Sequence, residues 1–90
     1  MTRRIKRESV FQSQFVDDLT HWVKTDRKAA LRVLELVHAI VQDPFAGIGK
    51  PEPLKHEFAG CWSRRITQEH RLVYRPTEDG LLIAQCRYHY

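Results

Sequence analysis

The feature that most constrains the fold of this 90-residue chain is a change of hydrophobic period around Pro44. Before Pro44 the apolar residues recur at the three- and four-residue spacing of amphipathic helices. Beyond Leu54 they alternate with polar residues, as they do in strands. Ninety residues are too few for two separate cores, so we expect residues 1–90 to form one domain in which the helical half packs against the strand half.

The helical half contains two amphipathic patterns. In residues 12–24 the apolar positions at helical spacing are Phe15, Val16, Leu19, Trp22 and Val23. Thr25 and Asp26 are turn and N-cap residue types, so a second helix is expected to begin there. Its apolar face is predicted to comprise Ala30, Val33, Leu34, Val37, Ile40 and Val41. Pro44 ends this helix because the residue before a proline avoids the helical region. The two patterns predict a helical hairpin.

Strand signals fill the rest of the chain. A short first strand is expected at residues 9–11. Alternation at 62–67 predicts a second strand, residues 72–74 follow as a third after a polar break, and residues 81–90 read as a long last strand. The sequence Glu78-Asp79-Gly80 is a hairpin signal before that strand. The predicted fold is therefore α+β, with two helices packed on one face of a largely antiparallel sheet.

Several classes of protein are excluded by what the sequence lacks. Two cysteines do not make a disulfide scaffold, and no apolar run approaches the ~18 residues of a membrane span. The basic leader, residues 1–6, has no apolar stretch behind it, so it is not a signal peptide. The five histidines lack metal-ligand spacing. We therefore expect a cytoplasmic protein with no membrane association, no metal site and no cofactor.

The distribution of positive charge favours a phosphate-containing partner. The formal net charge is +4, and between Trp62 and Tyr90 every lysine or arginine is an arginine. Guanidinium groups bind phosphates through two parallel hydrogen bonds and stack on bases, whereas lysine offers a point charge. The alternative is that these arginines form an ordinary solvated strand face.

The same half of the chain contains the residue types that metal-independent RNA cleavage requires. The 2′-hydroxyl of RNA can serve as the nucleophile, provided that a base, a group of cations and an acid surround the phosphate. Glu52 and Lys55 lie in PEPLKH, arginines occupy the strands, and His89 is next to the last residue. Each residue alone also has an ordinary explanation as a loop or strand residue.

Three segments add a resemblance to a known family. GKPEPLKH, WSRRITQEHRLVY and CRYHY closely resemble the YoeB toxins of the RelE superfamily, in the same order along the chain. These proteins are the toxins of bacterial type II toxin–antitoxin systems and cleave mRNA in the ribosomal decoding site. The resemblance implies the RelE fold and a ribosome-dependent endoribonuclease that inhibits translation.

The resemblance also implies roles for particular residues. Glu52 matches the family's general base, and Arg65 and Arg71 match its phosphate and transition-state contacts. His89 matches the general acid, and Tyr90 matches the terminal tyrosine that orients the substrate. Three further cations are expected to bind RNA phosphates: Lys50, Lys55 and Arg64.

The partners implied by the resemblance are the ribosome, mRNA, a second copy of the chain and an antitoxin. The antitoxin is expected to be YefM/Phd-like, acidic and partly disordered. The chain departs from some relatives at Ala46, Ile48 and Cys61. Two alternatives stay open: a ParE-like gyrase inhibitor of the same fold, and a non-catalytic module that binds RNA or protein. Neither alternative has a use for Glu52 together with His89.

Overall fold

The computed structural model describes residues 8–89; the expected leader at residues 1–6, together with Tyr90, lies outside this range. The elements within it are β1 (Glu8–Phe11), α1 (Ser13–Thr25), α2 (Arg27–Gln42), β2 (Glu52–Pro53), the 3₁₀ turn η1 (His56–Phe58), β3 (Trp62–Arg65), β4 (His70–Pro76) and β5 (Gly80–His89).

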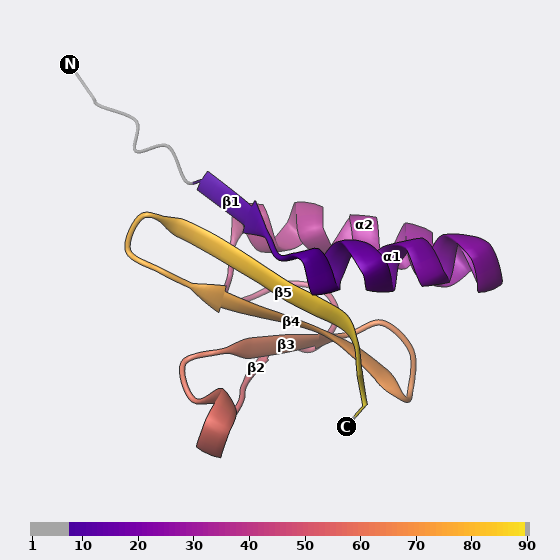
Figure 1. Ribbon diagram of the computed structural model, residues 1–90. Helices are drawn as coiled ribbons and strands as arrows, with labels where there is room; N and C mark the ends of the chain where they lie inside the picture. Colours follow the sequence, from indigo (N-terminus) through magenta and orange to yellow (C-terminus); the bar gives the residue numbers. More distant parts are fainter. Residues whose placement is uncertain (1–7, 90) are drawn as a thin grey trace.

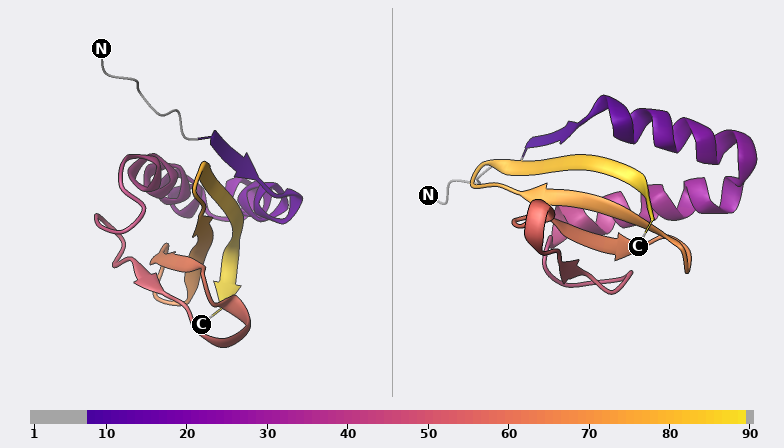
Figure 2. Two further views of the ribbon diagram at one scale, coloured as in Figure 1. Left: turned by 90° about the vertical axis from the view of Figure 1, so that its left-hand side faces the viewer. Right: turned by 60° about the horizontal axis from the view of Figure 1, so that its bottom comes forward.

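These elements form two layers. The described strands make one sheet in the order β1-β5-β4-β3-β2, in which β1 runs parallel to β5 and the other neighbours are antiparallel. Both helices lie on one face of this sheet, and η1 follows β2 at the edge of the sheet that lies farthest from the helices (Figure 1; Figure 2). The predicted α+β architecture is confirmed. Within residues 8–89, no helix has both the length and the apolar character that a membrane crossing requires.

The hydrophobic core fills the space between the helices and the sheet. Leu72, Tyr74 and Ile83 of the sheet are completely buried against Leu36 and Ile40 of α2. Full burial of one such aliphatic side chain contributes about 1.5–3 kcal/mol relative to its exposed state. This layer fixes the sheet on one side and leaves the opposite face available for a site.

The boundary between the helices agrees with the sequence prediction. Asp26 is the N-cap of α2, and its carboxylate accepts a hydrogen bond of 3.2 Å from the Ala29 amide. A side-chain cap of this kind stabilises a helix by about 1 kcal/mol. At the other end, α2 stops at Gln42, two residues before Pro44.

The predicted buried face of α2 was wrong in part. Leu34 and Val41 were expected in the core, but they are 53% and 41% exposed, whereas Leu36 is completely buried. The apolar stripe of the helix is wider than the surface that the sheet covers. The contact line runs along Val33, Leu36 and Ile40, at the i, i+3, i+7 spacing of one helix face.

A local irregularity in β5 is held by α1. The register between β4 and β5 shifts on both sides of Val73, so the Cys86 region bulges away from the regular ladder. The Cys86 amide donates to the buried Asp18 carboxylate at 3.0 Å, and the Trp22 indole N–H donates to the Cys86 carbonyl at 2.8 Å. The helix thus replaces the hydrogen bonds that the bulge removes from the sheet, and it sets the course of β5 toward His89.

Candidate active site

The sheet face without helices brings together three of the residues that were singled out from the sequence, Glu52, Arg65 and Arg71. Side chains directly opposite each other on paired strands share a face. The register pairs Glu52 with Ser63, Arg65 with Arg71, and Arg71 with Tyr88. Ser63 and Arg65 are two residues apart on β3, so all five side chains belong to the same face.

An ion pair lies at the centre of this face. Arg71 Nη1 is 2.7 Å from Glu52 Oε1 and also donates a 2.7 Å hydrogen bond to Ser63 Oγ. The Arg71 side chain is only 5% exposed, whereas the Glu52 side chain is 42% exposed. The buried guanidinium therefore holds a carboxylate whose other side is open to solvent, as a general base for an incoming hydroxyl must be.

The position of Glu52 depends on a very short strand. β2 comprises only Glu52 and Pro53 and pairs with β3 at the edge of the sheet. Proline is tolerated at an edge because an N–H on the outer side of an edge strand would have no neighbouring strand to donate to. Pro51 and Pro53 restrict the backbone on both sides of Glu52, so the carboxylate is presented from a stiff segment.

Arg64 does not belong to this face, and its predicted role as an RNA contact was wrong. It is 0% exposed and lies on the helix-facing side of β3. Its guanidinium donates to the Tyr74 hydroxyl and to three backbone carbonyls, those of Asp43, Ala46 and Ile48. The loop after α2 is therefore wrapped around a buried cation, which leaves no nitrogen exposed to a phosphate.

Two glycines of the segment Gly47–Lys50 (GIGK) give this loop its shape. Gly47 and Gly49 have φ values of +131° and +85°, a backbone conformation that favours glycine. A Cβ on Gly49 would lie 2.7 Å from Leu36 Cδ2 and 3.1 Å from Arg64 Cβ. The Tyr74 hydroxyl donates to the Pro44 carbonyl at 2.6 Å, and burial raises the pKa of Tyr74. The motif thus shapes a structural loop around Arg64.

The other predicted cations are accessible. Lys50, Lys55 and Arg65 are all exposed, and Arg65 shares the face of the Glu52–Arg71 pair. Lys50 and Lys55 flank Glu52 in the chain, two residues before it and three after it. Exposed cations of this kind attract a polyanion.

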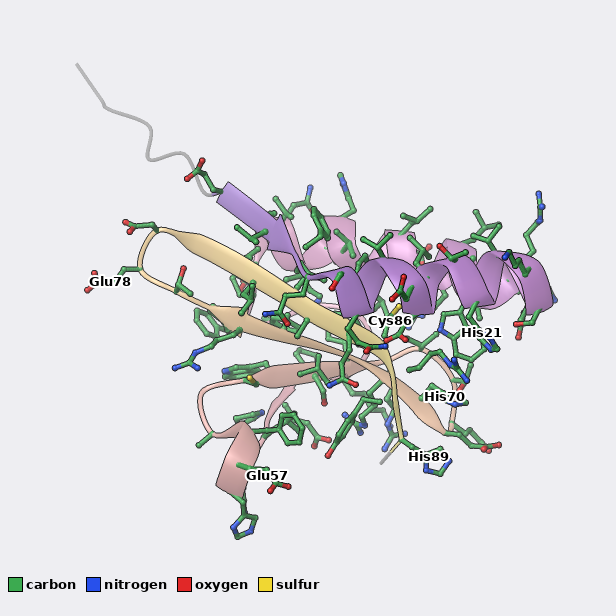
Figure 3. All side chains as sticks on the ribbon, viewed as in Figure 1. His21, Glu57, His70, Glu78, Cys86 and His89 are labelled. Carbon is green, nitrogen blue, oxygen red and sulfur yellow. The ribbon has the colours of Figure 1, made fainter. Side chains whose placement is uncertain are left out.

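His89 lies on the other side of β5 from this pair. It is opposite His70 in the register, with ring centroids 5.6 Å apart, and its Nε2 is 3.6 Å from Glu69 Oε2 (Figure 3). Strand alternation puts Tyr88 on the Arg71 face and His89 on the helix side. Its side chain is 68% exposed at the end of the strand. The structure therefore does not bring His89 together with Glu52, and Tyr90 lies outside the described residues.

The largest depression beside the ion pair lies between β2, η1 and β5. It has a volume of about 390 Å³, and its lining includes Glu52, Leu54, Lys55, Phe58 and Tyr88. The Phe58 and Tyr88 rings meet edge to face with centroids 5.2 Å apart. Among residues 8–89, no three histidine, cysteine, aspartate or glutamate side chains gather closely enough to hold a metal ion.

Comparison with known proteins identifies the family. A family model for the YoeB-like toxins of bacterial type II toxin–antitoxin systems matches residues 11–90. The chain belongs to this family. Toxin YoeB of Streptomyces coelicolor is 54% identical over 80 residues, covering 89% of this chain and 95% of its own length. Toxin YoeB of Escherichia coli K12 is 52% identical over 81 residues, covering 90% and 96%.

Solved structures of YoeB toxins share the fold. A YoeB/ParE toxin from Agrobacterium tumefaciens superposes with a TM-score of 0.83 at 45% identity, covering 92% of this chain and 99% of its own. A YoeB dimer from Staphylococcus aureus superposes with a TM-score of 0.83 at 39% identity, covering 93% of this chain and 98% of its own. The YoeB–YefM complex from the same organism superposes with a TM-score of 0.80 at 37% identity, covering 94% of this chain and 99% of the matched chain. The predicted membership of the YoeB family is confirmed.

Two features of this YoeB-family site were missed from the sequence. Ser63 is completely buried and accepts the hydrogen bond from Arg71, so it positions the guanidinium. His70 packs edge-on against both Trp22 and His89, with centroid distances of 4.9 and 5.6 Å. Strand alternation could have revealed Ser63, since it shares the parity of Arg65, whereas the contact of His70 with Trp22 depends on how α1 crosses the sheet.

Proposed function

We propose that this YoeB-family toxin is a ribosome-dependent endoribonuclease that cleaves mRNA in the decoding site without a metal ion and so inhibits translation. The observation that carries the proposal is the partly exposed Glu52 carboxylate, which is paired with the buried Arg71 guanidinium, with exposed Arg65 on the same sheet face and Lys55 in the lining of the adjoining cavity. A non-catalytic binding surface would need the cations but not a carboxylate fixed among them.

Glu52 is assigned as the general base. It takes the proton from the 2′-hydroxyl, whose oxygen then attacks the adjacent phosphorus. The bond from phosphorus to the 5′-oxygen breaks, which leaves a 2′,3′-cyclic phosphate on the upstream fragment. The salt bridge to Arg71 holds the carboxylate at Oε1 while the side chain stays 42% exposed, so the base is oriented before RNA arrives.

Arg71 and Arg65 are assigned to the negative charge that develops on the phosphorane. They are direct neighbours across β3 and β4, and Arg65 is exposed. Loss of one charge-stabilising contact of this type costs about 10²–10³-fold in rate.

Protonation of the leaving 5′-oxygen is assigned to His89, with Tyr90 orienting the substrate. His89 is next to Tyr88, which lies on the Arg71 face, and its side chain is held only by surface contacts with Glu69 and His70. Rotation of the side chain around the exposed end of β5 is required for the imidazole to reach the scissile phosphate. Substrate binding thus completes the site.

The ribosome supplies the positioning that the isolated protein lacks. A carboxylate is a weak base for a hydroxyl, so alignment of the attacking oxygen with the phosphorus must contribute much of the rate. Lys50, Lys55 and the basic sheet face provide contacts for ribosomal RNA and mRNA. We therefore expect slow cleavage of free RNA and rapid cleavage on the ribosome.

The same basic surface suits an acidic antitoxin. YoeB of Staphylococcus aureus has been solved in complex with YefM, and also as a dimer. We propose that this chain is neutralised in the cytoplasm by a YefM/Phd-like antitoxin that is acidic and partly disordered, and that it also forms homodimers. Opposite charge favours rapid association of the two proteins.

Primer extension on messages from cells that express the toxin tests the proposal against the gyrase alternative. Discrete cuts within translated regions, absent when translation is blocked before elongation, are expected. DNA breaks without cuts in mRNA would instead identify a gyrase inhibitor, and growth arrest with neither lesion would identify a binding module.

A further inference from the structure

The cavity beside Glu52 has aromatic walls that the proposed chemistry does not use. Phe58 of η1 and Tyr88 of β5 are 30 residues apart in the chain. The centroids of their rings are nevertheless 5.2 Å apart, with an interplanar angle of 69°. Both rings line the cavity, and both residues are only partly buried. The side chain of Leu54 adds a further apolar contribution to the lining.

The size and composition of the cavity suit one planar ring system with a phosphate attached. Its volume of about 390 Å³ lies within the range of small-ligand pockets, which starts at about 300 Å³. Bases of single-stranded RNA bind to proteins mainly by stacking on aromatic side chains, and every base offers such a face. Lys55 adds a cation to the lining, and a cation there attracts the phosphate of a bound nucleotide.

The place of Glu52 in the lining decides which nucleotide would enter. We propose that this cavity binds the base of the nucleotide whose 2′-hydroxyl is deprotonated, with Phe58 and Tyr88 as its stacking walls. The inference rests on the proposed function, because Glu52 selects that nucleotide by reaching its ribose. Phe58 thereby becomes a substrate-binding residue of the site.

A second aromatic pair in the chain provides a matched control. Phe45 meets Trp62 with centroids 5.2 Å apart at 68°, almost the same geometry as Phe58 and Tyr88. Phe45 is exposed and lies on the loop after α2, away from the cavity lining. Replacement of each phenylalanine by leucine keeps an apolar side chain and removes the aromatic ring.

The test is single-turnover cleavage on programmed ribosomes by the full chain, with two versions of one mRNA. The first mRNA is intact, and the second carries an abasic ribonucleotide immediately upstream of the cut. On intact mRNA, Phe58→Leu should slow cleavage by about 10-fold or more, while Phe45→Leu should cleave at the wild-type rate. On abasic mRNA, wild type should fall to the level of Phe58→Leu, and the substitution should cause no further loss.

Equal losses for Phe58→Leu on both messages would show that the ring only supports the fold, and this result would overturn the inference. Wild-type rates for Phe58→Leu on intact mRNA would overturn it as well. Binding of a 2′-O-methyl trinucleotide, monitored by NMR, tests the cavity independently of cleavage. Failure of the cavity proposal can therefore be distinguished from failure of the proposed function. If the wild-type protein cuts no message, saturable binding that Phe58→Leu weakens and Phe45→Leu preserves still supports the cavity. Equal binding by both variants rejects it.

Discussion

Two adjacent arginines should respond to the same substitution in opposite ways. Arg64 and Arg65 follow each other on β3 but point to opposite faces of the sheet. Arg64 is completely buried beneath the loop after α2, while Arg65 is exposed beside Arg71. Arg64→Ala should therefore lower stability with Arg65→Ala leaving it nearly unchanged, and Arg65→Ala should slow cleavage in a folded protein.

The size of the stability effect follows from the contacts of Arg64. Its guanidinium donates hydrogen bonds of 3.1 Å to the Tyr74 hydroxyl, 2.5 and 3.1 Å to the Asp43 and Ala46 carbonyls, and 3.2 Å to the Ile48 carbonyl. Each hydrogen bond to a charged group contributes about 1.5–3 kcal/mol. Renewed hydration of the loop carbonyls and relief of the buried charge offset part of the loss, so we expect about 3–5 kcal/mol.

That loss is a large part of the total. A chain of this length has an unfolding free energy of about 5–13 kcal/mol, and its melting temperature falls by about 4–8 °C for each kcal/mol. Arg64→Ala should thus melt at least ~12 °C below wild type. Arg65→Ala, on an exposed position, should stay within about 0.5 kcal/mol of wild type.

Urea unfolding followed by tryptophan fluorescence measures both variants, because Trp22 lies in the core and Trp62 packs against Phe45 of the same loop. Cleavage on programmed ribosomes is measured in parallel. An Arg64→Ala protein that unfolds at the wild-type urea midpoint but cannot cleave mRNA would refute the structural role of Arg64. A destabilised Arg65→Ala protein would refute the assignment of the two faces.

Four further predictions concern other parts of the molecule. Cys61 should react with one equivalent of iodoacetamide at pH 8 in the folded protein, and a second equivalent should react only after unfolding, because Cys86 is buried and burial raises the pKa of its thiol to about 12. In the unfolded chain the Cys86 thiol has the ordinary pKa of 9.0, so it loses its proton at a lower pH than in the folded protein. Above pH 9, Cys86 should therefore lower the unfolding free energy by up to about 1.4 kcal/mol per pH unit. Cys86→Ala should remove this loss in urea titrations. Asp18→Ala should cost about 1–3 kcal/mol in the same assay, since the Cys86 amide would lose its acceptor at the bulge; an unchanged midpoint would show that the bulge needs no support from α1. Arg71→Ala should slow single-turnover cleavage by about 10²-fold or more, whereas Arg75→Ala, at an exposed position outside the ion pair, should change it little; equal small losses would indicate a diffuse binding surface.

Local patterns in the sequence predicted most of the fold. The helical spacing, the N-cap at Asp26, the stop before Pro44 and the hairpin at Gly80 each depend on residues close in the chain. β2 was missed because a two-residue strand containing a proline carries no alternation. The register shifts around Val73 were missed as well, because the groups that stabilise the bulge come from α1, 68 residues before Cys86 in the case of Asp18.

The candidate site was predictable to the extent that strand parity fixes it. Because side chains alternate along a strand, Arg65 shares a face with Ser63. Arg64 shares the opposite, apolar face with Trp62 and Ile66. The alternation itself therefore indicates the buried side for Arg64, although its positive charge favours an exposed position. The ion pair of Glu52 with Arg71 could not be inferred, because the two residues lie on strands that are not neighbours and meet across β3.

The most direct test of the central claim is the chemistry of the cut on programmed ribosomes, measured for wild type and Glu52→Gln. Glutamine keeps the size of the side chain and removes its function as a base. Wild type should leave a 2′,3′-cyclic phosphate or 3′-phosphate on the upstream fragment, and folded Glu52→Gln should cut about 10²–10⁴-fold more slowly. Upstream fragments with 3′-hydroxyl ends, or a folded Glu52→Gln protein that cuts at the wild-type rate, would contradict the account.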